Sequence, residues 1–287
     1  MTLKKYCVQC APSKNQSQLI SIVENLMNPV ISIATKAARA AGKVINRALN
    51  TQQDLLVQEK GVNNYVTNID HECETAIIQT LQKAYPSHSF LTEERELIVG
   101  KDEDYLWVID PIDGTTNFIH NLPHFAVSIA LKIQGVTHYG VIYNPMTDQL
   151  FTAIKGEGSQ LNGKRLRVSS RNKIEGSLIS PAFPRLDRFQ PEYQDMIFNL
   201  ARTCGGLRYS GSATLDIAYV AAGFLDAIWR TDLQPWDMAA GLLMVKEAGG
   251  LVADLNGGLE IQGGDFIAAS PKMAKLLLPL ISNQLIK

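Results

Sequence analysis

The sequence predicts a mixed α/β (α+β) protein in which helices cover the faces of sheets. Two observations carry this prediction. Apolar residues recur at helical spacing in several segments, and short runs rich in valine, isoleucine and phenylalanine lie between glycines and polar turns. The chain has 287 residues, of which 46% are hydrophobic, so it is long enough to bury a large core. Mixed sheets covered by helices follow from this order of elements.

The first part of the chain is expected to contain an extension, two helices and a hairpin. Pro12 and several polar residues interrupt any pattern over residues 1–26, which we expect to be poorly ordered. Apolar residues at helical spacing predict a helix over 28–49. Residues 54–70 are expected to form a hairpin, and a second helix over 70–85 ends before a proline.

The remaining elements are predicted by β-prone runs and by helical periodicity. Strands are expected at 88–91, 106–109, 125–133, 136–142, 150–154, 207–209, 224–229, 251–255 and 265–270. Helices are expected near 190–203, at 213–222, at 236–248 and at the end of the chain. We expect residues 27–287 to form one domain, with an N-terminal α+β half at 27–180 and a C-terminal α/β half at 181–287.

The composition argues against several classes of protein. A net charge of −1 provides no general field for nucleic acid or an anionic membrane. No apolar run is long enough to span a bilayer, and no apolar core follows the first lysines as a secretory signal requires. A cytoplasmic protein is therefore expected. Cys7 and Cys10 form a CxxC without a second such pair, so we interpret them as incidental residues of a polar tail rather than a zinc or redox site.

Two short motifs allow a turn as an alternative. GSQLNGKR at 158–165 is close to a phosphate-binding P-loop, but Arg165 stands where that motif needs serine or threonine. Asn162 and Gly163 favour a two-residue hairpin turn there instead. The pair Asp113-Gly114 could by the same reasoning be only a hairpin turn.

Carboxylates gather at the ends of predicted elements. The stretch WVIDPIDGTTN places Asp110 and Asp113 directly after a buried apolar run, and TEERE places Glu93 and its neighbour Glu94 after another. Asp237 lies in the first turn of a predicted helix after Pro235. A capping role, favoured by the helix dipole, is the simpler explanation for Asp237.

The acid at position 70 also stands at a helix start, so a cap is the simpler explanation for Asp70 as well. Like charges that are held close together raise one another's pKa unless a cation lies among them. Hard oxygen ligands suit Mg²⁺, which binds carboxylates, waters and a substrate phosphate. Such ions can activate a water and stabilise a departing oxygen.

These motifs resemble those of the inositol monophosphatase family. WVIDPIDGTTNF is similar to its first signature and WDMAAGLLMVKEAGG to its second, while VTNID, PSHSFLTEE and GSATLDIAYVAAG match in order and spacing. The resemblance runs from Met27 onward. NPVISIATKAARAAG and LDIAYVAAG resemble the bacterial SuhB type. The resemblance implies a layered α-β-α-β-α sandwich, and it also implies that the protein forms a homodimer.

The resemblance also implies the roles of individual residues. The Mg²⁺ ligands it implies are Glu93, Asp110, the backbone carbonyl of Ile112, Asp113 and Asp237. The substrate contacts it implies are Asp113, Gly114, Thr115, Ala213, Arg230 and Asp237. Glu93 and Thr115 would orient the attacking water, and Asp70 would assist a third ion or that water. Glu94 and Thr116 would support the ligands from behind. A helix N-cap is the alternative role for Thr115.

The implied activity is Mg²⁺-dependent hydrolysis of small phosphorylated polyols or sugars, with inositol 1-phosphate as the expected substrate and with lithium sensitivity. A water activated by the metal would attack the phosphorus in line, without a phosphoenzyme. SuhB-type proteins also associate with the transcription machinery and with ribosomal RNA antitermination complexes. A binding role in which catalysis is secondary is therefore an alternative.

One position departs from the family pattern. Members that hydrolyse inositol phosphates usually carry a glutamate seven residues before the aspartate of the WD pair, where this chain has Arg230. A fixed cation there favours an anionic group, which makes a sugar bisphosphate or a nucleotide-derived phosphate an alternative substrate. The opposing interpretation is that Asp232 neutralises Arg230, or that Arg230 lies at a subunit contact.

Overall fold

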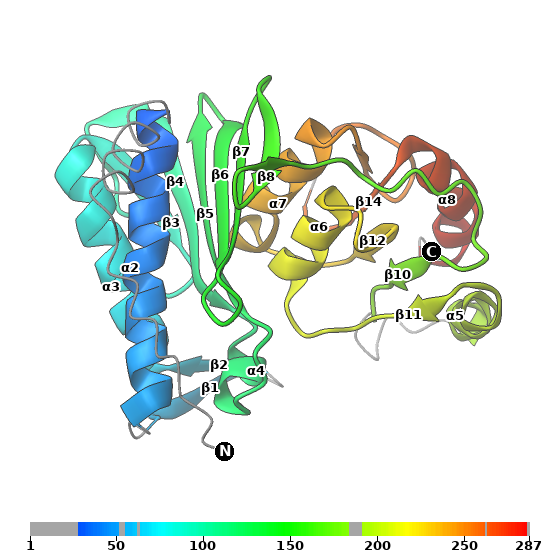
Figure 1. Ribbon diagram of the computed structural model, residues 1–287, viewed down its shortest axis with the longest axis horizontal. Helices are drawn as coiled ribbons and strands as arrows, with labels where there is room; N and C mark the ends of the chain where they lie inside the picture. Colours follow the sequence, from blue (N-terminus) through cyan, green and yellow to red (C-terminus); the bar gives the residue numbers. More distant parts are fainter. Residues whose placement is uncertain (1–27, 52–54, 62–63, 184–190, 262, 286–287) are drawn as a thin grey trace, which may run out of the picture.

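A computed structural model describes residues 28–51, 55–61, 64–183, 191–261 and 263–285. The predicted extension and its cysteines at positions 7 and 10 lie outside these residues. Figure 1 shows five layers, in which helices and sheets alternate across the molecule. The helices are α2 (Pro29–Thr51), α3 (Asn68–Ala84), α4 (Thr115–Ile119), α5 (Pro191–Thr203), α6 (Ala213–Ala221), α7 (Pro235–Glu247) and α8 (Pro271–Leu285). This arrangement confirms the predicted α-β-α-β-α sandwich.

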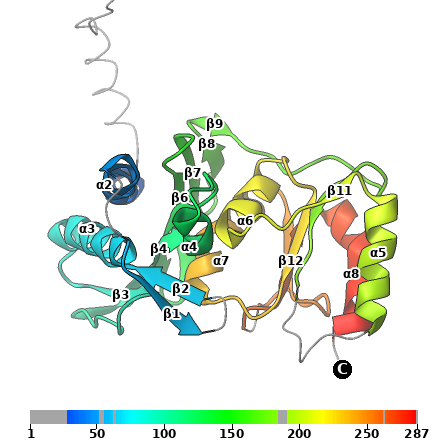
Figure 2. The same cartoon turned by 90° about the horizontal axis from the view of Figure 1, so that it is seen from below.

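The layers follow from which helices cover which sheet. Helices α2 and α3 cover one face of the larger sheet, and α6 and α7 lie between the two sheets (Figures 1 and 2). Helices α5 and α8 pack together on the outer face of the smaller sheet. Among the described residues, no helix has the length and apolar character that crossing a lipid bilayer requires.

The larger sheet has seven strands in sequential order, with β3 and β4 parallel and all other neighbours antiparallel. Its strands are β3 (His88–Thr92), β4 (Asp102–Asp113), β5 (Ala126–Ile133), β6 (Val136–Asn144), β7 (Gln149–Ile154), β8 (Gly158–Leu161) and β9 (Lys164–Arg165). The smaller sheet has the order β11-β10-β12-β14-β13. Its strands are β10 (Leu178–Ser180), β11 (Gly206–Leu207), β12 (Ala227–Arg230), β13 (Leu251–Ala253) and β14 (Phe266–Ala269). A separate hairpin joins β1 (Val57–Gly61) to β2 (Asn64–Thr67).

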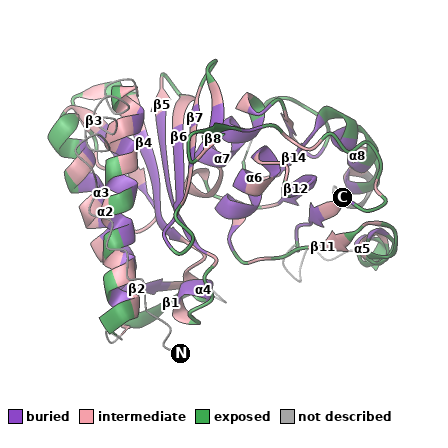
Figure 3. Ribbon diagram, in the orientation of Figure 1, coloured by how far each residue is buried: buried purple, intermediate pink, exposed green. Residues whose placement is uncertain are grey.

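Burial explains why the central helix departs from an amphipathic pattern. Helix α7 packs against strands of both sheets, so residues 239–245 are buried without a break. A helix that is enclosed on all sides has apolar residues all around its surface rather than on one face. Helix α2 instead buries one stripe of small residues, including Ala37 and Ala41, against α3 and the larger sheet. Figure 3 shows this contrast between enclosed and half-exposed helices.

Most predicted elements are present, and the differences have local causes. GSQLNGKR forms the predicted hairpin, since Asn162 and Gly163 have φ of 48° and 77° between β8 and β9. Strand β12 begins at Ala227 rather than at 224. Strand β10 was not predicted, because three residues are too few for a periodic signal. Strand β4 runs on to Asp113, beyond its predicted end at 109.

Candidate functional site

A β-bulge brings the two aspartates of the WVIDPID stretch to one side of the larger sheet. Residues three apart on a regular strand point to opposite faces. Here Asp110 pairs with Ser128 and Asp113 with Ala126, so β4 uses one residue more than β5 between the two pairs. The extra residue turns both carboxylates to the same side. Pro111 fits the bulge because it has no N–H to donate to a ladder. The aspartates therefore lie on a bulged strand, and the alternative of an Asp113-Gly114 hairpin turn is wrong.

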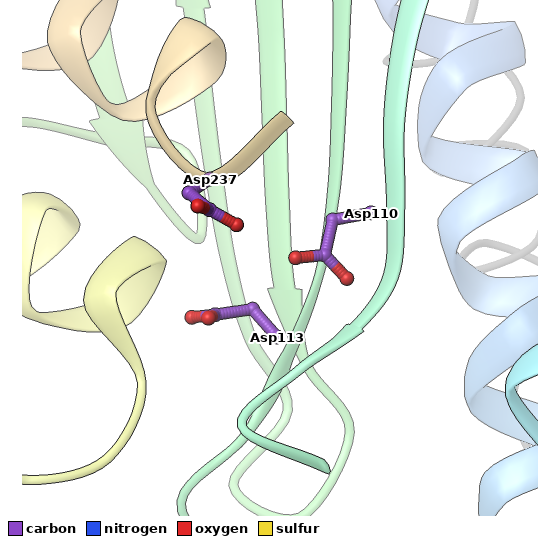
Figure 4. Close-up of side chains that lie close together, drawn as sticks. All are labelled: Asp110, Asp113 and Asp237. Carbon is purple, nitrogen blue, oxygen red and sulfur yellow. The ribbon is translucent and has the colours of Figure 1, made fainter. Parts of the chain in front are cut away.

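Asp237 completes a triad of carboxylates from a distant part of the chain. It lies in the first turn of α7, after Pro235, and its Oδ2 accepts a hydrogen bond of 2.8 Å from the N–H of Gln234. The expected cap is therefore present. Figure 4 shows the side chains of Asp110, Asp113 and Asp237 converging, and one oxygen of each lies within 4.8 Å of the others.

The loop after β3 contributes two further carboxylates. Glu93 and Glu94 both accept from the ammonium of Lys60 on β1, at 2.9 and 2.7 Å. Glu93 faces the triad, whereas the Glu94 side chain is almost fully buried behind it. Arg95 forms an ion pair of 2.6 Å with buried Glu74 of α3 and so fixes the far end of this loop. Lys60 has no sequence signal, since its hairpin carries no motif.

Gly114 and Thr115 connect the bulge to α4. Gly114 has φ of 94°, and a Cβ there would lie 3.1 Å from the carbonyl oxygen of Gly211, so only glycine fits without strain. Gly114 is also the N-cap of α4, so the N-cap interpretation of Thr115 is wrong. The Thr115 hydroxyl lies 3.2 Å from the Asp70 carboxylate and 3.0 Å from the carbonyl oxygen of Ile112. Its single proton can be donated to only one of them at a time.

Asp70 has a structural partner as well. Its Oδ2 accepts from the backbone N–H of Thr67 at 2.8 Å, in a capping box at the start of α3. The predicted cap is therefore present, and its other oxygen reaches Thr115. Asp70 is fully buried beneath the site.

The start of α6 holds Asp113 from the other side. Asp113 Oδ2 accepts from the hydroxyl of Ser212 and, at 2.8 Å, from the N–H of Thr214. One carboxylate oxygen is thus committed to α6, which leaves the other for the triad. Ser212 was not predicted as a site residue, although a serine before a helical run signals a cap.

Most predicted site residues line one cavity of about 490 Å³. Those that do are Glu93, Asp110, Ile112, Asp113, Gly114, Thr115, Thr116 and Asp237. Ala213 and Arg230 instead line a neighbouring cavity that shares Asp113 and Gly211 with the first. Among the described residues that line the larger cavity, Lys60 is the only cation.

Burial of so many acids shifts their protonation. Burial, with the repulsion of Asp113, raises the pKa of Asp237 to about 8. Burial also raises the pKa of Asp113 to about 6, although hydrogen bonds from Ser212 and Thr214 oppose the rise. For Asp110, burial and then the charge of Glu93 raise the pKa well above its ordinary value. These carboxylates repel one another and favour a cation between them.

The donor set fits a hard divalent cation. Three carboxylates with raised pKa values present oxygens within 4.8 Å of one another, beside Glu93 and without a sulfur or imidazole ligand among them. Oxygen-only sites of this kind suit Mg²⁺. His124, whose burial lowers its pKa, lies beside Asp216 rather than at the triad.

Arg230 is engaged inside the protein. Its Nη2 donates to Asp216 Oδ2 at 2.7 Å and to Ser180 Oγ at 2.8 Å, while Nη1 donates to three backbone carbonyls at 2.9–3.0 Å. The side chains of Arg230 and Asp216 are both almost fully buried. The expectation that Asp232 neutralises Arg230 is wrong, because the counter-ion is Asp216 of α6.

The Arg230–Asp216 pair generates a stability prediction. Asp216→Leu should lower the free energy of unfolding by about 3–5 kcal/mol, because it leaves a buried guanidinium without its counter-ion. The double variant Asp216→Leu/Arg230→Met should recover most of that loss, since it removes both charges. Urea unfolding of the three proteins measures this. Equal losses in the single and the double variant would contradict the buried pair.

The raised pKa values generate a pH prediction. In the unfolded chain these aspartates titrate near 3.8, whereas Asp113 and Asp237 titrate near 6 and 8 in the folded protein. The folded state therefore binds more protons between these values, and its stability should fall as pH rises from about 4 to 8. In the presence of a chelator, Tm should fall over this range. Asp237→Asn should make Tm depend less steeply on pH, whereas Asp195→Asn, at an exposed position, should leave this dependence unchanged. Equal pH dependence of Tm in the two variants would contradict the raised pKa of Asp237.

Comparisons with known proteins agree with this geometry. The model of the inositol monophosphatase family matches residues 26–285. The chain is 46% identical over 264 residues to "Nus factor SuhB" of Pasteurella multocida, covering 90% of this chain and 99% of that protein. The crystal structure of extragenic suppressor protein suhB from Bartonella henselae superposes with a TM-score of 0.85 at 43% identity, covering 88% and 98% of the two chains.

An inositol monophosphatase from Anabaena (Nostoc) sp. superposes with a TM-score of 0.76 at 35% identity, covering 89% of this chain and 96% of that one. Both solved structures share the five-layered fold over nearly their whole length. With two signatures, one converging set of acids and a family match over almost the entire chain, the protein belongs to the inositol monophosphatase family.

Proposed function

We propose that the protein is a Mg²⁺-dependent phosphoric monoester hydrolase that acts in the cytoplasm on small phosphorylated polyols, with inositol 1-phosphate as the expected substrate. The observation that carries the proposal is the convergence of Asp110, Asp113 and Asp237 beside the N-terminus of α4. Carboxylates that need a cation lie next to backbone N–H groups that favour an anion. A divalent cation held by the carboxylates, together with a phosphate that contacts both this cation and the N–H groups, would satisfy both.

The ligands for Mg²⁺ in this proposal are Glu93, Asp110, Asp113, Asp237 and the backbone carbonyl of Ile112. When bound, Mg²⁺ lowers the pKa of a water and offsets the charge that develops on the phosphoryl oxygens. In this proposal the backbone N–H groups of Gly114 and Thr115, which line the same cavity, hold the phosphate.

Two side chains orient the attacking water in this proposal. Glu93 accepts one of its protons, and the hydroxyl of Thr115 fixes its direction. Asp70 holds that hydroxyl in place from below, at 3.2 Å. Lys60 ties the loop of Glu93 and Glu94 to the β1–β2 hairpin. In this proposal Glu94 and Thr116 support the ligands from behind.

The buried pairing of Arg230 bears on the substrate. Its donors already serve Asp216, Ser180 and backbone carbonyls, which weighs against a bisphosphate as the preferred substrate. By family likeness, the proposal also includes inhibition by lithium and a homodimer. It further includes a single domain over 27–287, whose two halves meet at residue 180.

Phosphate release with and without Mg²⁺ tests the proposed activity. The purified protein should release phosphate from inositol 1-phosphate with Mg²⁺ and lose that activity in a chelator. Asp237→Asn should lower kcat by at least about a hundredfold, because even the outer partners of metal ligands cost 10–100-fold when removed. Asp195→Asn on α5 changes the same functional group at an exposed position and should leave kcat unchanged.

Full phosphate release in the chelator would refute the metal requirement. Full activity of Asp237→Asn with Mg²⁺ would instead refute the assignment of Asp237 as a ligand of the metal ion. Differential calorimetry of the variant shows whether a loss of activity reflects the site or the fold.

A second function is favoured by the relatives named Nus factor SuhB, which match 90% of this chain at 44–46% identity. We infer that the protein also associates with the transcription machinery. In this proposal the association does not depend on catalysis.

Affinity capture separates the two functions. The protein and its Asp237→Asn variant should be retained equally by bacterial RNA polymerase assembled for antitermination on a ribosomal RNA leader, because the variant changes only the acid cavity. The same polymerase on an unrelated transcript is the control. Retention of neither protein would remove the second function, and loss in the variant alone would place the contact at the cavity.

A further inference from the structure

Helix α3 presents two buried carboxylates to the acid site. Asp70 and Glu74 are four residues apart, so they lie on the same face of the helix, about 6 Å apart along its axis. Neither residue is exposed to solvent. The Asp70 carboxylate lies 3.2 Å from the hydroxyl of Thr115, whereas Glu74 contacts the loop that follows β3. One face of one helix therefore contacts two parts of the site.

Glu74 depends on a single counter-ion. Its Oε2 lies 2.6 Å from Nε of Arg95. Within the described part of the chain, no hydrogen bond from another residue reaches either oxygen of this carboxylate. A buried carboxylate is costly unless it is paired. The pair therefore holds Arg95 on α3, because moving Arg95 away would leave a buried charge alone.

A second contact fixes the direction of the Arg95 side chain. Its Nη2 donates to Oγ1 of Thr75, the residue after Glu74. The Thr75 hydroxyl donates its own proton to the carbonyl oxygen of His71 at 2.8 Å, so towards Arg95 it can only accept. A guanidinium is a planar fork of donors, and acceptors at two neighbouring positions hold that fork in one orientation.

The loop that Arg95 anchors also carries Glu93. Phe90 and Ile98 exchange two backbone hydrogen bonds of 2.9 Å, which close the loop at its base. Lys60 contacts Glu93 at 2.9 Å from the β1–β2 hairpin, while α3 holds Arg95. Two residues of extended chain span at most about 7 Å. The position of Arg95 therefore limits where the Glu93 carboxylate can lie.

We propose that Arg95 is a positioning residue of the metal site, and that its ion pair with Glu74 sets where the Glu93 carboxylate meets a divalent cation. The proposal rests on the phosphatase function proposed above, in which Glu93 is a metal ligand and orients the attacking water together with Thr115. Asp70 holds Thr115, and Glu74 holds the loop of Glu93. One face of α3 thus fixes these two groups relative to each other.

Position and charge predict opposite effects when Arg95 is removed. By charge alone, loss of a cation two residues from Glu93 would strengthen the binding of Mg²⁺. Loss of the anchor instead weakens it, since removal of the outer partners of metal ligands lowers affinity by about 10–100-fold. Arg95→Met should therefore bind Mg²⁺ about tenfold more weakly than the wild-type protein. Tighter binding would overturn the proposal.

Titration calorimetry of the metal-free protein with Mg²⁺, without substrate, is the principal test. The double variant Arg95→Met/Glu74→Met removes one charge of each sign and leaves no buried carboxylate unpaired, so the fold is kept. It should bind Mg²⁺ about tenfold more weakly than the wild-type protein, as expected when such a partner is lost. Equal affinities of the double variant and the wild-type protein would overturn the proposal.

A second ion pair of α3 provides the matched control. Arg47 of α2 and Glu72 of α3 lie 2.7 Å apart, and their side chains are 59% and 38% exposed. Arg47→Met/Glu72→Met makes the same chemical change at an exposed place outside the site, so it should bind Mg²⁺ as the wild-type protein does. An equal loss of affinity in this control would assign the effect to α3 as a whole and overturn the proposal.

Activity at different concentrations of Mg²⁺ separates positioning from general damage. In Arg95→Met/Glu74→Met the concentration of Mg²⁺ for half-maximal activity should rise about tenfold. At saturating Mg²⁺ the bound ion restores the place of Glu93, so kcat should stay within about a factor of two of the wild-type value. A fall in kcat by the same factor at every concentration would overturn the proposal.

Hydrogen exchange of the metal-free protein gives an outcome that needs no metal. Residues 90–98 should exchange faster in Arg95→Met/Glu74→Met, because the loop loses its anchor, while β5 and β6 should exchange as in the wild-type protein. Faster exchange throughout the protein would indicate a general loss of stability, and unchanged exchange would show that the loop needs no anchor. Either result would overturn the proposal.

These measurements distinguish failure of this proposal from failure of the proposed function. If no ester is hydrolysed, but Mg²⁺ binds and Arg95→Met/Glu74→Met weakens that binding tenfold, the positioning role is supported and only the activity is refuted. If phosphate is released with Mg²⁺ and the double variant binds the ion as the wild-type protein does, the activity stands and the positioning role is refuted. A wild-type protein that binds no Mg²⁺ would overturn both.

Discussion

Repulsion among buried carboxylates is the interaction on which the rest of this structure depends. Burial raises the pKa values of Asp110, Asp113 and Asp237, and repulsion from the neighbouring carboxylates, including Glu93, raises them further. The fold offsets this cost locally, with the N-termini of α6 and α7 and with the ammonium of Lys60 opposite Glu93. The offset is incomplete, and the remaining repulsion favours a cation between these carboxylates.

The layered fold explains how one cavity collects acids from distant parts of the chain. Strand β4 belongs to the larger sheet, whereas α7 lies between the two sheets and is buried on all sides. The end of a bulged strand and the start of an enclosed helix can therefore meet, and neither can shift without repacking the core. Rigid placement of this kind suits a site whose chemistry depends on electrostatics.

Arg230 departs from the family pattern, and the surrounding residues neutralise its charge. Viewed in the sequence, a cation at a substrate-contact position predicts an anion in the substrate. In the folded protein the guanidinium faces Asp216, Ser180 and backbone carbonyls, and it supports the ring of Tyr209 from below. A charge that is buried must be paired. The pairing partner, rather than the residue type, decides whether this guanidinium is free to meet an anion.

By itself the sequence determined the family, most elements and the acids of the site, because helical periodicity, turn residues such as Asn162-Gly163 and spacing within WVIDPIDGTTN are local signals. The tertiary structure alone decided the bulge that turns Asp110 and Asp113 to one side, the ion pair of Lys60 with Glu93, and Asp216 as the partner of Arg230. These depend on contacts between residues far apart in the chain. Strand register and the burial of charge have no local signature, so no spacing in the sequence can reveal them.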